Sequence, residues 1–93
     1  MLNIIKISVM IRLMKRTKTE GDDVRFYCFA KAKQQPRISW SRGNGKTLPS
    51  RAVVSGKILL ISKIRKGDEG DYVCTARNIY GSETGSTQLR VQG

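Results

Sequence analysis

The two cysteines of the chain, Cys28 and Cys74, carry side chains suited to disulfide formation, metal binding or nucleophilic catalysis. Metal binding needs further ligands and catalysis needs a neighbouring base, but the 93 residues contain no histidine. We therefore expect no enzyme activity, no metal and no cofactor. The two thiols can form a disulfide in an oxidising compartment or stay reduced in the cytosol, and their number leaves both options open.

The chain is also strongly basic, because 18 Lys and Arg residues against 7 Asp and Glu give a net charge of +11. Such an excess attracts polyanions and acidic protein surfaces. No nucleic-acid-binding module is recognisable and aromatic residues that could stack on bases are few, so we expect no nucleic-acid partner. Sulfated glycans such as heparan sulfate are the sharper candidate; the alternative is that the lysines only solvate the surface.

Short runs of alternating polar and apolar residues, separated by turns, predict an all-β fold after residue 20. In the run 57–62 the alternation points Leu59 and Ile61 into the core. Strands are expected at 24–30, 37–42, 48–49, 51–54 and 57–62, followed by a strand with Tyr72, Cys74 and Ala76 inward and a last strand with Leu89 and Val91 inward.

Residues 1–19 carry an apolar alternation through Ile5, Ile7, Val9, Ile11 and Leu13 that suits an edge strand. An amphipathic helix and an unrelated flanking sequence are the alternatives. The apolar part is too short to span a membrane. We therefore divide the chain into an uncertain N-terminal edge strand or flanking segment at 1–19 and one domain at 20–93.

Four features share one frame: Cys28, the single tryptophan Trp40, and Tyr72 two residues before Cys74. This frame is typical of an immunoglobulin-like β-sandwich, in which two antiparallel sheets with Greek-key connections are joined through their core. Residues 21–92 resemble an immunoglobulin I-set domain, and pieces such as 72–76 and 88–92 are most similar to tandem repeats of the perlecan type, from basement-membrane heparan sulfate proteoglycans.

This resemblance implies a disulfide between Cys28 and Cys74, with Trp40 and Tyr72 packed beside it. It also implies that Asp68 is structural and forms a salt bridge with Arg51. The function implied is a non-catalytic, extracellular module that contacts matrix proteins, cell-surface proteins, glycans and neighbouring immunoglobulin domains in a tandem array. The alternatives are a structural spacer in a giant intracellular muscle protein and the ectodomain of a cell-surface adhesion receptor.

Two surfaces of the expected sandwich are candidates for binding. The first is a basic pole, where connections between strands gather at one end. Its candidate glycan-binding residues are Lys15, Arg16, Lys18, Arg42, Lys46, Lys63, Arg65 and Lys66. The second is the outer face of one sheet, where alternation places Tyr27, Phe29, Ile58 and Leu60. These four are either scattered exposed apolar residues or a contact with a neighbouring domain.

Overall fold

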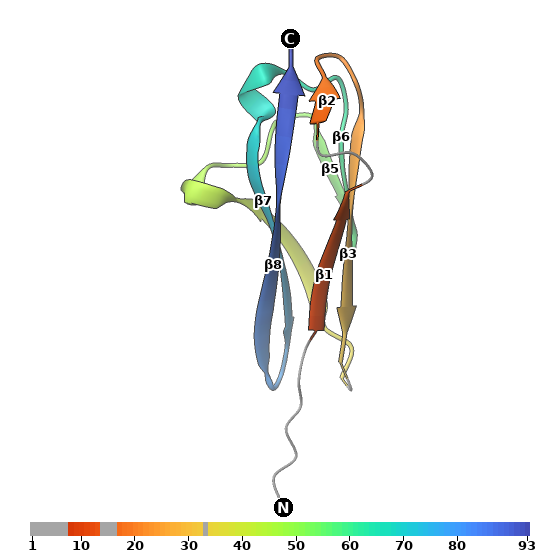
Figure 1. Ribbon diagram of the computed structural model, residues 1–93. Helices are drawn as coiled ribbons and strands as arrows, with labels where there is room; N and C mark the ends of the chain where they lie inside the picture. The colour runs from red at the N-terminus through yellow and green to blue at the C-terminus, as the bar shows by residue number, and fades with distance from the viewer. Residues whose placement is uncertain (1–7, 14–16, 33) are drawn as a thin grey trace, which may run out of the picture.

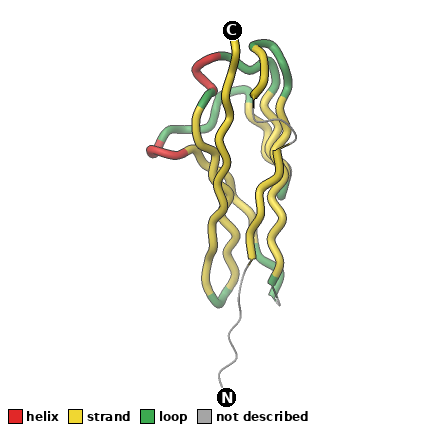
Figure 2. The backbone as a smooth tube through the Cα atoms, in the orientation of Figure 1, coloured by secondary structure: helices red, strands yellow, loops and turns green. Residues whose placement is uncertain are grey.

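The computed structural model describes residues 8–13, 17–32 and 34–93, which form a β-sandwich with two four-stranded sheets (Figure 1). The strands are β1 (Ser8–Leu13), β2 (Thr17–Thr19), β3 (Val24–Lys31), β4 (Arg37–Arg42), β5 (Ala52–Ser55), β6 (Ile58–Ile61), β7 (Gly70–Asn78) and β8 (Gly81–Gln92). Two short 3-10 turns, η1 (Gly43–Gly45) and η2 (Lys66–Asp68), lie on the connections (Figure 2). No helix among the described residues is long and apolar enough to cross a membrane.

One sheet has the strand order β1-β3-β6-β5 and the other has the order β2-β8-β7-β4. All pairs are antiparallel except β2 with β8, which run parallel. The two-sheet sandwich expected from the sequence is confirmed, and β2 with β8 is its parallel pair among the described strands. This pair is parallel because the chain leaves the first sheet after β1 and continues beside the last strand of the second sheet, where its direction matches that of β8.

The first nineteen residues thus contain two strands of the sandwich, one at an edge of each sheet. β1 pairs with β3 over its whole length, from Ser8 opposite Lys31 to Leu13 opposite Phe26. The side chains of 1–16 lie outside the described residues, and so does the predicted inward alternation of this strand. We treat both edge strands as part of the domain.

The core lies between the sheets and is filled by inward residues that alternate along β3, β6, β7 and β8. Cys28 on β3 and Cys74 on β7 form a disulfide that joins the two sheets, with their Cα atoms 6.3 Å apart. Closing a loop of 46 residues in this way stabilises a chain by about 4 kcal/mol. Phe26 packs beside the disulfide between Trp40 and Tyr72, at ring-centroid distances of 6.2 and 4.9 Å.

The connection between β4 and β5 differs from the prediction. No strand forms at 48–49; the chain turns there, and the carbonyl of Pro49 accepts a hydrogen bond from the amide of Ala52 at 2.9 Å. Leu48 packs against the core from this turn, so its apolar character serves packing and not strand pairing. The following strand is Ala52–Ser55, one residue later than expected.

Candidate functional site

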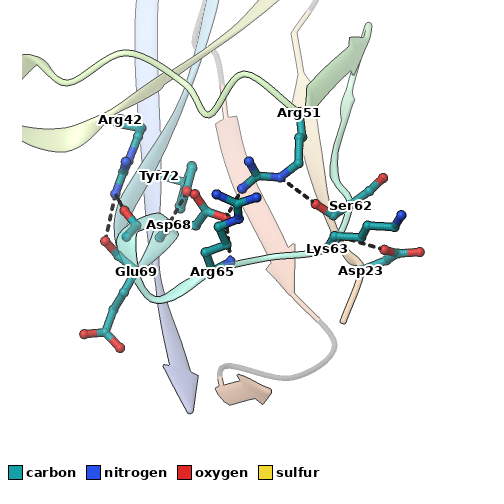
Figure 3. Close-up of polar contacts among 10 residues, drawn as sticks. Asp23, Arg42, Arg51, Ser62, Lys63, Arg65, Asp68, Glu69 and Tyr72 are labelled. Carbon is teal, nitrogen blue, oxygen red and sulfur yellow. Dashed lines mark hydrogen bonds and ion pairs between the residues drawn. The ribbon is translucent and has the colours of Figure 1, made fainter. Parts of the chain in front are cut away.

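The corner between β6 and β7 is organised around the carboxylate of Asp68, which is 7% exposed (Figure 3). Arg51 donates from Nη2 to Asp68 Oδ2 at 2.8 Å, and from Nε to the carbonyl of Ser62 at 3.1 Å. The amide of Arg65 donates to the same carboxylate oxygen at 2.8 Å. Asp68 therefore neutralises Arg51 and caps the η2 turn, which is a structural role.

Tyr72 closes the same corner from inside the core. Its hydroxyl donates to the carbonyl of Asp68 at 2.6 Å, and its side chain is buried. Burial is the main cause that raises the pKa of Tyr72 to about 12, although the neighbouring guanidinium of Arg42 acts in the opposite direction. The tyrosine therefore stays protonated at neutral pH and serves as a hydrogen-bond donor.

Two cations of the predicted basic pole are used by the fold itself. Arg42 donates to the carbonyl of Glu69 at 2.7 Å, and its guanidinium carbon lies 5.2 Å from the centre of the Tyr72 ring. Lys66 donates from Nζ to the carbonyl of Val91 at 2.8 Å and to Glu69 Oε1 at 3.2 Å. The hydrogen bond from the amide of Val91, followed by that from Lys66, holds the pKa of Glu69 below its ordinary value.

The other cations of the pole are less concentrated than the sequence suggests. Lys15 and Arg16 lie outside the described residues. Lys46 follows η1, which projects from the side of the sandwich and not from the end that holds η2 (Figure 1). Lys63 and Arg65 are exposed, and Lys18 is half-buried. Of the six predicted cations that the structure describes, Lys18, Lys63 and Arg65 lie near η2 and are not engaged by the described part of the fold.

A different pair of cations lies toward the opposite end of β7, on the outer face of the sheet. Arg37 on β4 is directly opposite Arg77 on β7, and both are exposed. Among the described residues, neither side chain has a hydrogen-bond or ion-pair partner. Opposed like charges on neighbouring strands destabilise a sheet by about 0.2–1 kcal/mol. The sequence alternation predicts that Arg77 faces outward, but only the strand register brings Arg37 beside it.

The surface around this arginine pair is polar. Outward positions of β4, β7 and β8 carry small hydroxyl side chains at Ser39, Ser41, Thr75, Ser82, Thr84 and Ser86. Ser82 is the partner of Arg77 in the strand register. A shallow depression of about 470 Å³ continues this face beside β2, where Thr17, Ser86, Thr87, Gln88 and Arg90 line it.

The outer face of the other sheet is apolar at its centre, as the alternation predicts. Phe29 is 45% exposed, and Tyr27 stacks on it with ring centroids 6.4 Å apart. Ile58 and Leu60 are half-buried. The strand register adds the exposed Val53 to this face, because Val53 on β5 lies opposite Leu60 on β6. The sequence analysis did not include Val53 in this surface.

Comparison with known proteins gives consistent matches. The model of the immunoglobulin I-set domain family matches residues 7–91. Contactin rig-6 of Caenorhabditis elegans is 39% identical over 74 residues, which are 77% of this chain and 6% of that protein. The basement membrane-specific heparan sulfate proteoglycan core protein of Mus musculus is 40% identical over 73 residues, 77% of this chain and 2% of that protein.

Solved structures agree on the fold. The ectodomain of mouse nectin-like molecule 4 superposes with a TM-score of 0.84 at 28% identity, covering 91% of this chain and 30% of that one. Titin domain M4 superposes with a TM-score of 0.79 at 20% identity over 99% of this chain and all of that one, which shows the fold alone. The chain thus spans a small part of the curated relatives it matches, and it belongs to the immunoglobulin I-set family.

Proposed function

We propose that this domain is a non-catalytic, extracellular module of a matrix or adhesion protein, which presents a rigid surface to proteins and glycans. The observation that carries the proposal is the disulfide between Cys28 and Cys74, which joins the two sheets across the core. Disulfides persist in oxidising compartments and are rare in the cytosol. A β-sandwich that is cross-linked by a disulfide suits a domain that works outside the cell.

The relatives support the same compartment. One is named for the basement membrane, and the nectin-like structure is an ectodomain. The intracellular alternative, a mechanical spacer, is supported by the titin likeness, which lies at 20% identity and concerns the fold only. The chain covers only a small share of each relative, as expected for one domain of a tandem array. In such an array, weak contacts of single domains add up to useful avidity.

The redox state of the cysteine pair tests the proposal. The chain would be produced through a secretory pathway and alkylated in denaturant, with and without prior reduction, and its mass measured. We expect no alkylated cysteine in the unreduced sample and both cysteines alkylated after reduction. Two alkylated cysteines in the unreduced sample would contradict the proposal and favour the intracellular spacer.

A further inference from the structure

We propose that Arg37 and Arg77 form the centre of a binding site for a sulfated glycan, on the outer face of β4, β7 and β8. The two residues are directly opposite each other in the antiparallel register. Side chains at such positions start with their Cβ atoms about 5 Å apart. Two guanidinium groups can therefore reach the same sulfate, and each can bind it through two parallel N–H donors.

Among the described residues, no carboxylate lies close to the two arginines on this outer face. Glu83 belongs to the same hairpin but alternates with Ser82, so it points away from the arginine face. The nearest carboxylate on the outer face is that of Asp71, six residues before Arg77 on β7. At a rise of about 3.3 Å per residue, it lies roughly 20 Å away. An anion bound between the arginines would relieve their mutual repulsion.

The chemistry of the surrounding face selects among anionic ligands. A stable protein interface needs an apolar core, whereas the outward positions near the pair are mostly Ser and Thr, with Val73 on β7 and the exposed Ile79 at the hairpin tip as the apolar exceptions. Hydroxyl groups donate and accept hydrogen bonds, which suits the hydroxyl-rich surface of a sugar. Nucleic acid would require several stacking aromatics. The hairpin tip offers one exposed ring, that of Tyr80.

The hairpin that carries Arg77 is held in place by the next residue. Asn78 donates from Nδ2 to the carbonyl of Gln34 at 3.0 Å, and its Oδ1 accepts from the amide of Tyr80 at 2.9 Å. These bonds join the β7–β8 hairpin to the connection that leads into β4, and so to Arg37. The backbone that positions both arginines is therefore fixed before a ligand arrives, which lowers the cost of binding.

The test is heparin affinity of the folded, oxidised chain with matched charge changes. The variant R37S/R77S removes two positive charges from the proposed site, and K63S/R65S removes two from the exposed residues near η2. Circular dichroism would first verify that both variants are folded. We expect R37S/R77S to bind a heparin octasaccharide roughly tenfold more weakly in 0.15 M NaCl, with a much smaller loss in K63S/R65S. Equal losses would overturn the proposal, because binding would then follow net charge alone.

A charge-preserving variant sharpens the test. In R37K/R77K the charge is kept but the planar donors are lost. We expect affinity between those of the original chain and R37S/R77S; affinity equal to the original would overturn the claim of guanidinium recognition. Desulfated heparin, which keeps its carboxylates, is expected to bind at least tenfold more weakly than heparin. Equal binding of both would overturn the assignment to sulfate. None of these outcomes depends on the cysteine alkylation result.

Discussion

The two ends of β7 use positive charge in opposite ways. At the end near Tyr72, Arg51 and Arg42 donate to a carboxylate or to backbone carbonyls, and their charge is absorbed by the fold (Figure 3). At the other end, Arg37 and Arg77 face each other on the surface without such acceptors among the described residues. The first end stabilises the domain, whereas the second costs stability and is available for a ligand. The position of a cation relative to its acceptors, and not its presence, separates structural from binding residues.

The largest effect is expected from Asp68→Ala at the corner. The change leaves Arg51 without its carboxylate and the amide of Arg65 without its acceptor. Because the Arg51 side chain is 29% exposed, water compensates part of the loss, and we expect a decrease of about 3 kcal/mol in the free energy of unfolding. Urea denaturation measures it. The matched variant Asp71→Ala, on the exposed face, should change stability by less than about 0.5 kcal/mol.

Tyr72→Phe should have a smaller effect that depends on pH. Below pH 10 the variant loses the hydrogen bond to the carbonyl of Asp68, which is worth about 1–2 kcal/mol. The pKa of Tyr72 is raised to about 12 in the folded state, so the hydroxyl ionises first in the unfolded chain. The stability advantage of tyrosine is therefore complete below pH 10 and is lost as the pH rises toward 12. Denaturation of both proteins from pH 8 to 12 checks this, and a constant difference would contradict it.

Lys63→Gly should produce a slight gain. Lys63 has φ 49°, in the left-handed region that favours glycine, while its amide donates to Asp23 Oδ1 at 3.0 Å. Glycine removes the steric cost and keeps the amide, so we expect an increase of about 0.5 kcal/mol in the free energy of unfolding. The control Lys31→Gly, in β3, should lower stability by a similar amount. A loss in both variants would indicate that the Lys63 side chain contributes to the corner.

Much of the corner could be predicted from the sequence, because it belongs to a recognisable family pattern. The spacing of Cys28, Trp40, Tyr72 and Cys74 identifies the fold family, and the family resemblance then supplies Arg51 as the partner of Asp68. The hydrogen-bond acceptors of Arg42 and Lys66 could not be predicted in this way. Their acceptors are backbone carbonyls of Glu69 and Val91, and the positions of such carbonyls depend on the packed structure.

The pairing of Arg37 with Arg77 was not predicted from the sequence, for a different reason. Alternation assigns a face to each residue but does not assign its neighbour on the next strand. The register that places Trp40 opposite Cys74 also places Arg37 opposite Arg77. A search that fixed the tryptophan and cysteine as a pair could therefore have found the two arginines from the sequence.

The opposite use of charge at the two ends of β7 is tested most directly by urea denaturation of Arg42→Ser and Arg77→Ser in one low-salt buffer. Arg42→Ser removes a guanidinium that donates to Glu69, and it should lower the free energy of unfolding by about 1–2 kcal/mol. Arg77→Ser relieves the repulsion with Arg37 and should raise it by about 0.2–1 kcal/mol. Opposite signs would support the division between the two ends of β7, and a similar loss in both variants would contradict it.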